Sequence, residues 1–159
     1  MTQLSYIKET QFMDNAALLR EASSFYELAE LGRIQIPEKK DVESHIPYIV
    51  NMSFSAELCL KLLLIHNGNN IKDIKSYRHR LFDLYNNLTD IQKEKIYQSF
   101  HRPLIYSIET ELQSIDNAFF DWRYLVFEKI NSNRKKLQYK PFFIKEFTEI
   151  LINLCSNLK

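Results

Sequence analysis

Apolar side chains recur along this chain at steps of three and four residues, the spacing that gathers them on one face of an α-helix. One such stretch predicts a helix over about residues 10–31, with an earlier start left open and with Gly32 at a position where helices commonly end. A second stretch predicts a helix over residues 47–66. Its middle, residues 56–65, is apolar nearly all round, which is typical of a helix at the centre of a bundle.

The same spacing predicts four more helices, separated by polar or basic loops at residues 69–78 and 131–139. These helices cover residues 79–87, 89–101, 107–130 and 141–154. The second of them opens with a capping box, Thr89-Asp90-Ile91-Gln92. Only 2 Gly and 4 Pro occur, which disfavours turn-dense β folds. We therefore expect one all-α domain over residues 1–159, an up-and-down bundle of four long helices with a short helical pair between the second and the fourth.

Composition adds that the chain is globular and nearly neutral. Hydrophobic residues make up 45% of the 159 residues and charged residues 26%, which are values of a folded domain. Lys and Arg number 21 against 20 Asp and Glu, a net charge of +1. No strong global field therefore attracts nucleic acid or a membrane, which leaves room only for a local basic patch.

Cysteines and apolar runs indicate the compartment. Cys59 and Cys155 are far apart and lie in apolar stretches, which excludes a CxxC site and indicates buried, inert thiols. Residues 1–8 lack the apolar run of a signal peptide. The longest apolar run, residues 58–65, contains Lys61 and is too short to cross a bilayer. We therefore expect a cytoplasmic protein without a membrane partner.

Common catalytic and cofactor motifs are missing from the sequence. It has no Gly-rich phosphate loop, no HExxH and no GxSxG. The four histidines, His45, His66, His79 and His101, fall on different segments, and nothing in their spacing forms a metal site. The sequence therefore predicts no metal and no cofactor.

Three segments nevertheless carry candidate chemistry. Glu57 and Lys61 are four residues apart on the most apolar helix, and both a half-exposed ion pair and a charged pair lining a groove are open. Arg78-His79-Arg80 is either a set of exposed loop charges, the commoner case, or a cationic cluster near a phosphate. Arg123 stands among aromatic residues, where it is either a structural ion-pair partner or a phosphate-binding residue.

In chain order these segments resemble HEPN domains, compact α-helical modules of prokaryotic toxin–antitoxin and phage-defence systems. The resemblance covers residues 53–130. It rests on E-x-x-x-K (Glu57, Lys61), H-x-L-x-x-L-Y (from His79) and R-Y-x-x-x-E (Arg123, Tyr124, Glu128). It implies a helical bundle that forms a homodimer. Many members are metal-independent endoribonucleases with an R-x4-6-H motif.

Carried over to this chain, the resemblance makes Arg123 the motif arginine, which would bind the scissile phosphate and stabilise its developing charge. The motif histidine is missing, because positions 128–130 are Glu128, Lys129 and Ile130. Either Glu128 or His79 would then have to accept the proton of the RNA's own 2′-hydroxyl. The missing histidine favours a module that binds without cleaving.

Three functions follow as hypotheses. The first is an RNA-binding or protein-interaction module, acting as a homodimer or with a cognate antitoxin or nucleotidyltransferase partner. The second is a metal-independent endoribonuclease toxin that uses Arg123 with His79 or Glu128. The third is a helical assembly domain without nucleic acid. The expected RNA-phosphate contacts are Lys61, Arg78, Arg80, Arg134 and Lys135, with Glu57 and Tyr124 in supporting roles.

Four aromatic residues are hard to place on the buried faces of the predicted helices. They are Phe100, Tyr106, Phe120 and Tyr139. Because large aromatic side chains anchor protein interfaces, we expect these four at a dimer seam.

Overall fold

The computed structural model describes residues 3–34, 45–116 and 140–158, and every regular element within these residues is a helix. The prediction of an all-α bundle is confirmed. The helices are α1 (Gln3–Ile34), α2 (Ile46–His66), α3 (Ile71–Ser76), α4 (Leu81–Asn86), α5 (Asp90–Gln98), α6 (Ile108–Ser114) and α9 (Pro141–Ser156).

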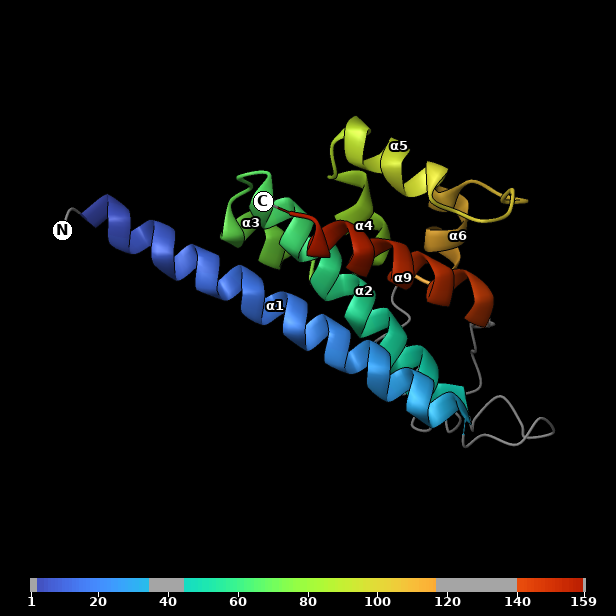
Figure 1. Ribbon diagram of the computed structural model, residues 1–159. Helices are drawn as coiled ribbons and strands as arrows, with labels where there is room; N and C mark the ends of the chain where they lie inside the picture. Colours follow the sequence, from blue (N-terminus) through green and yellow to red (C-terminus); the bar gives the residue numbers. More distant parts are fainter. Residues whose placement is uncertain (1–2, 35–44, 117–139, 159) are drawn as a thin grey trace, which may run out of the picture.

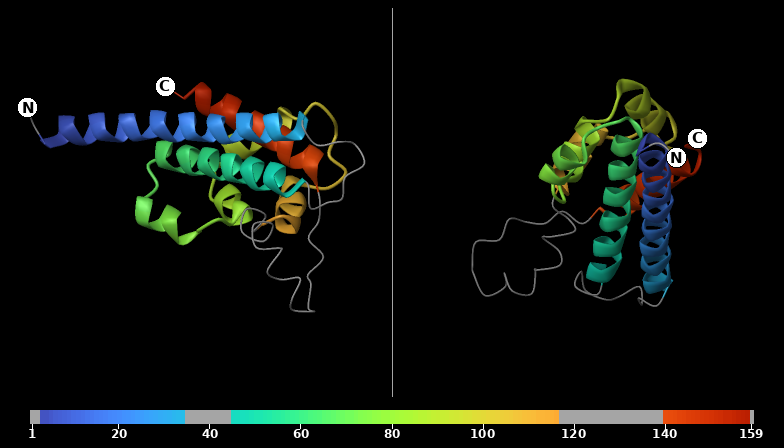
Figure 2. Two further views of the ribbon diagram at one scale, coloured as in Figure 1. Left: turned by 90° about the horizontal axis from the view of Figure 1, so that it is seen from below. Right: turned by 90° about the vertical axis from the view of Figure 1, so that its left-hand side faces the viewer.

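The long helix α2 lies in the middle of the molecule. It forms an antiparallel hairpin with α1, and α9 packs beside both and runs in the same direction as α2 (Figure 1). The shorter helices α3, α4 and α6 lie on the opposite side of α2 from α1 (Figure 2). Central placement explains why α2 is apolar nearly all round, as the sequence predicts.

Small and hydroxyl-bearing residues let the long helices approach one another. Ala22 and Ala29 of α1 are buried, and the hydroxyl of Ser55 donates to the Ala22 carbonyl at 2.6 Å. On the other flank of α2, the hydroxyl of Thr148 lies 3.3 Å from the Met52 carbonyl. The Ser55 hydroxyl therefore joins α2 to α1 inside the core, whereas the Thr148 hydroxyl is better placed to donate to the Ile144 carbonyl of its own helix, at 2.6 Å.

By length and composition alone, α2 could cross a membrane. The helix has 21 residues, Ile46–His66, and an 18-residue window within it is apolar enough, although the unbroken apolar run seen in the sequence is shorter. However, 72% of that window is buried inside the protein. Packing against α1, α4 and α9 therefore accounts for the hydropathy of this helix.

Local signals predicted several boundaries correctly. The capping box at the start of α5 is confirmed, with the amide of Gln92 donating to the Thr89 hydroxyl at 3.3 Å and the amide of Thr89 donating to the Gln92 side chain at 3.2 Å. The end of α2 is confirmed at His66, where Gly68 has a φ of +81°. Pro141 begins α9 as expected.

Other boundaries differ from the prediction. Helix α1 has the earlier start that the prediction left open, at Gln3, but it ends at Ile34 rather than before Gly32. The expected loop at residues 69–78 contains α3, whose first turn is capped by Asn70. Helix α4 begins two residues later than expected, and α5 ends at Gln98. The predicted helix over residues 107–130 begins where expected, at Ile108, but it is not continuous, because α6 ends at Ser114. Residues 117–130 lie outside the described part of the chain.

The predicted dimer seam is described for two of its four aromatic residues. Phe100 packs against the core, with its ring stacked on Phe143 at a centroid distance of 6.0 Å. Tyr106 is exposed, and the ammonium of Lys140 lies 5.6 Å from its ring centre. Phe100 is therefore partly buried against the core of its own chain, and the dimer seam stays a prediction. Phe120 and Tyr139 lie outside the described residues.

Candidate functional site

A carboxylate is buried on the face of α2 that looks toward α4. Glu57 is 1% exposed, and the ammonium of Lys61, one helical turn later, donates to its Oε1 at 2.6 Å. The Lys61 side chain is 21% exposed, so the ammonium pairs with the buried carboxylate while part of its side chain reaches solvent. The interpretation of a half-exposed surface pair is therefore wrong for Glu57.

The loop between α3 and α4 adds an imidazole to this pair. His79 Nδ1 lies 2.9 Å from Glu57 Oε2 and 3.1 Å from Oε1. Because an ionised carboxylate only accepts hydrogen bonds, Nδ1 carries the proton in this contact. The His79 side chain is 41% exposed, so the imidazole connects the buried carboxylate to the molecular surface. We call Glu57, Lys61 and His79 the Glu57 cluster.

The backbone immediately before His79 has an unusual conformation. Arg78 has a φ of +52°, a left-handed conformation that residues other than glycine rarely adopt. Such outliers persist where the surrounding structure fixes them, and they concentrate at functional sites. After His79, the chain enters α4, whose Leu81 and Leu84 are fully buried. The imidazole is therefore held between a left-handed residue and a helix anchored in the core.

Asp116, which sequence reasoning missed, contacts this loop from the end of α6. Its carboxylate accepts hydrogen bonds from the amide of Phe82 at 2.7 Å and from Arg80 Nε at 2.9 Å. Arg80 also pairs with Asp83 at 2.9 Å. The hydrogen bond to Asp116, followed by the charges of Asp116 and Asp83, raises the pKa of Arg80 above its ordinary value. Arg80 is therefore a charge shared between two carboxylates.

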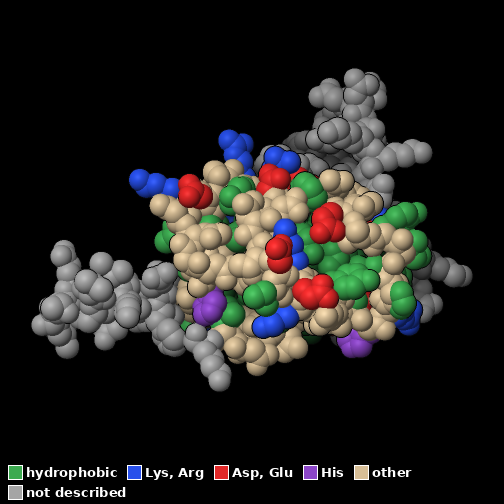
Figure 3. Space-filling view, turned by 90° about the horizontal axis from the view of Figure 1, so that it is seen from above, with side chains coloured by type: hydrophobic (Ala, Val, Ile, Leu, Met, Phe, Trp, Pro, Cys, Tyr) green, Lys and Arg blue, Asp and Glu red, His purple; other side chains and the backbone are tan. Residues whose placement is uncertain are grey.

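Arg78 differs from Arg80 in this respect. Among the described residues, its exposed guanidinium makes no ion pair or hydrogen bond. Elsewhere on the surface, as on the face shown in Figure 3, basic and acidic side chains are interspersed. Arg78 thus adds an uncompensated positive charge immediately beside His79.

The structure brings together only part of the predicted site. Lys61 and His79 both contact Glu57, and Arg78 and Arg80 flank the imidazole along the chain. The remaining predicted residues lie outside the described part of the chain: Arg123, Tyr124, Glu128, Arg134 and Lys135. Their participation stays a prediction.

The chemistry available to the Glu57 cluster is proton transfer and anion binding. A carboxylate that accepts from one imidazole nitrogen fixes the orientation of the ring and directs the other nitrogen away from the carboxylate. Lys61 and Arg78 supply positive charge nearby. Among the residues whose side chains the structure describes (15–33, 45–116 and 140–158), no group of three or more His, Cys, Asp or Glu is arranged to hold a metal ion.

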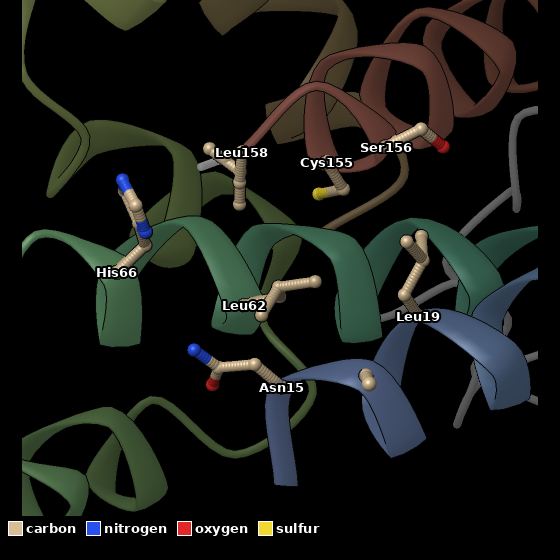
Figure 4. Close-up of a pocket in the computed structure, with 8 residues that line it drawn as sticks. Asn15, Leu19, Leu62, His66, Cys155, Ser156 and Leu158 are labelled. Carbon is tan, nitrogen blue, oxygen red and sulfur yellow. The ribbon is translucent and has the colours of Figure 1, made fainter. Parts of the chain in front are cut away.

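A separate cavity lies between α1, α2 and α9. It has a volume of about 180 Å³, and its walls include Leu19, Leu62, His66 and Cys155 (Figure 4).

Both cysteines are buried and free, as predicted, and the thiol of Cys155 donates to the Cys59 carbonyl at 3.5 Å. A hydrogen bond with Cys155, together with burial, raises the pKa of Cys59, which makes an unreactive thiol. The cavity between α1, α2 and α9 shares no residue with the Glu57 cluster.

Comparisons with known proteins add no relative. No protein-family model, curated protein or solved structure matches this chain.

Proposed function

We propose that this chain is a HEPN-like RNA-binding module whose RNA-contacting surface includes Lys61, Arg78 and His79. The observation that carries the proposal is the hydrogen bond between His79 and the buried Glu57 carboxylate, at 2.9 Å. Burial of an ionised carboxylate costs free energy unless it is paired. Here the partner of the buried Glu57 carboxylate is His79, whose imidazole is partly exposed and follows Arg78, a residue in a left-handed conformation.

The charges around the imidazole support an anionic ligand. Arg78 is an exposed cation without a partner among the described residues, whereas the charge of Lys61 is offset by the Glu57 carboxylate with which it pairs. Arg80 contributes less, because Asp83 and Asp116 neutralise it. RNA rather than another polyanion is what the resemblance to HEPN domains supports. Few phosphate contacts are expected, because basic and acidic residues nearly balance in the chain, 21 against 20, and both signs are interspersed on the face shown in Figure 3.

The proposal is tested by the affinity and salt dependence of RNA binding. The chain offers a matched control: His101 and Arg102 are adjacent and exposed, and His101 pairs with Glu146 at 3.0 Å as His79 does with Glu57. We expect Arg78→Ala and His79→Ala to weaken binding of a fluorescein-labelled single-stranded RNA. His101→Ala and Arg102→Ala should bind as the wild type does.

Each lost phosphate contact should also reduce the slope of log affinity against log salt by about 1. Equal losses in both sets of variants would contradict a site at His79. A wild-type protein that shows flat RNA titrations would refute RNA binding and favour a helical assembly domain.

A second candidate function is RNA cleavage without a metal, and the contact between His79 and Glu57 favours it. In this reaction the RNA's 2′-hydroxyl attacks the adjacent phosphorus, a cyclic phosphate forms, and the 5′-oxygen leaves with a proton. His79 would accept the proton of the hydroxyl, while Glu57 stabilises the imidazolium that results. Arg123 would bind the phosphate, and Glu128 is the alternative base. Both lie outside the described residues.

Cleavage in the presence of EDTA separates the two candidates. Cleavage that survives EDTA and is lost in both His79→Ala and Arg123→Ala, but not in His101→Ala, would establish the enzyme. Binding without cleavage by the wild type would establish the non-catalytic module.

The resemblance further implies a homodimer, or a complex with a cognate antitoxin or a nucleotidyltransferase. Light scattering at micromolar concentration tests the homodimer directly. A monomer at that concentration would contradict it.

A further inference from the structure

Asp116 holds the beginning of α4 at three points. The amide of Phe82 donates to its Oδ1 at 2.7 Å, the amide of Leu81 donates to its backbone carbonyl at 3.1 Å, and Arg80 Nε donates to its Oδ2 at 2.9 Å. The first amides of a helix have no partner within the helix, and the residue before α4, Arg80, provides no side-chain cap. Asp116 supplies that cap from another element.

The position of α4 depends on such external support. With 6 residues, α4 is far shorter than a helix that is stable by itself. Leu81 and Leu84 anchor one face of it in the core, and Asp116 fixes its first turn. His79 lies two residues before Leu81, so the backbone that Asp116 holds determines where the imidazole meets Glu57.

We propose that Asp116 is the positioning residue of the His79 site: its hydrogen bonds to the backbone of Leu81 and Phe82 place His79 Nδ1 on the Glu57 carboxylate. In this role Asp116 contacts no RNA. Its consequence for RNA binding rests on the proposed function, whereas its consequence for the imidazole does not.

The backbone contacts, rather than the ion pair with Arg80, carry this role. The Arg80 side chain is half exposed, and exposed ion pairs contribute little to structure. Asp83 pairs with the same guanidinium at the same distance, 2.9 Å, while the side-chain carboxylate of Asp116 additionally accepts from a backbone amide of α4. Asp83 is therefore the matched control for the loss of one ion pair to Arg80.

The test compares Asp116→Ala, Asp116→Asn and Asp83→Ala in the full chain. Imidazole ¹H–¹⁵N NMR without RNA reports the hydrogen bond and tautomer of His79, and fluorescence anisotropy reports RNA affinity. We expect Asp116→Ala to lose the His79 hydrogen-bond signature and to bind RNA about fivefold more weakly, the effect of a contact of ordinary strength. Asp116→Asn keeps an oxygen for the Phe82 amide, so it and Asp83→Ala should match the wild type.

Unchanged His79 signals in Asp116→Ala would overturn the proposal, as would equal changes in Asp116→Ala and Asp83→Ala. If circular dichroism shows that Asp116→Ala does not fold, Asp116→Asn decides, because loss of the His79 signature there would assign the role to the ion pair. A wild type that binds no RNA refutes the proposed function, and the NMR comparison then judges Asp116 on its own.

Discussion

Replacement of Lys61 by methionine removes the ammonium that lies 2.6 Å from a carboxylate with 1% exposure. Methionine keeps the apolar stem, so the change is one of charge and hydrogen bonding. Breaking a fully buried pair by removing one partner costs about 3–5 kcal/mol. Here the loss is smaller, because His79 still donates to Glu57 and Lys61 itself is partly exposed. We expect Lys61→Met to lower the free energy of unfolding by about 2 kcal/mol.

A second substitution shows whether the cost comes from the carboxylate left behind. Glu57→Gln keeps the shape of the side chain and removes its charge. The double variant Glu57→Gln/Lys61→Met leaves no buried charge, so it should be more stable than Lys61→Met alone. Residues that share such a contact have interaction energies of about 0.5–3 kcal/mol.

Urea unfolding followed by circular dichroism measures these differences. Glu146→Gln is the control, because its imidazole partner, His101, is 85% exposed and the pair should contribute less than about 1 kcal/mol. The reasoning is refuted if Lys61→Met is as stable as the control variant, or if the double variant is no more stable than Lys61→Met.

Three further outcomes are expected. Ser55→Ala loses a hydrogen bond to α1 and should cost about 1 kcal/mol in urea unfolding. The equally buried hydroxyl of Ser53 has no hydrogen-bond partner among the described residues, so Ser53→Ala should cost nothing. Burial alone would raise the pKa of Glu30, but the hydrogen bond and charge of Lys145 lower it below 4.5. The wild type should therefore exceed Glu30→Gln in melting temperature near pH 7, and the difference should vanish as the pH falls below 4.5. Arg78→Gly relieves a left-handed residue, so its melting temperature should rise while its RNA affinity falls.

Local features of the fold were predictable from the sequence. The capping box of α5, the end of α2 near Gly68 and the start of α9 at Pro141 each depend on a few neighbouring residues. The end of α6 was not predictable from the sequence, because it depends on partners that are distant along the chain. The backbone beyond Ser114 leaves the helix, and Asp116 binds amides of α4 instead.

In the candidate site, too, local features were predictable from the sequence and distant contacts were not. Its residues could be named from their types and spacing, but the contact between Glu57 and His79 joins positions 22 residues apart. That contact depends on α3, on the left-handed turn at Arg78 and on the cap from Asp116. None of these three has a strong local signal. Asp116 in particular was hidden inside an expected continuous helix.

The most direct test of the central claim is to map where RNA lies on the protein. Photocrosslinking with a 4-thiouridine-labelled single-stranded RNA, followed by mass spectrometry, identifies the peptides in contact. The account predicts crosslinks in the peptide that carries Arg78 and His79, and their loss in Arg78→Ala. Crosslinks confined to other surfaces, such as the peptide that carries His101 and Arg102, would contradict it.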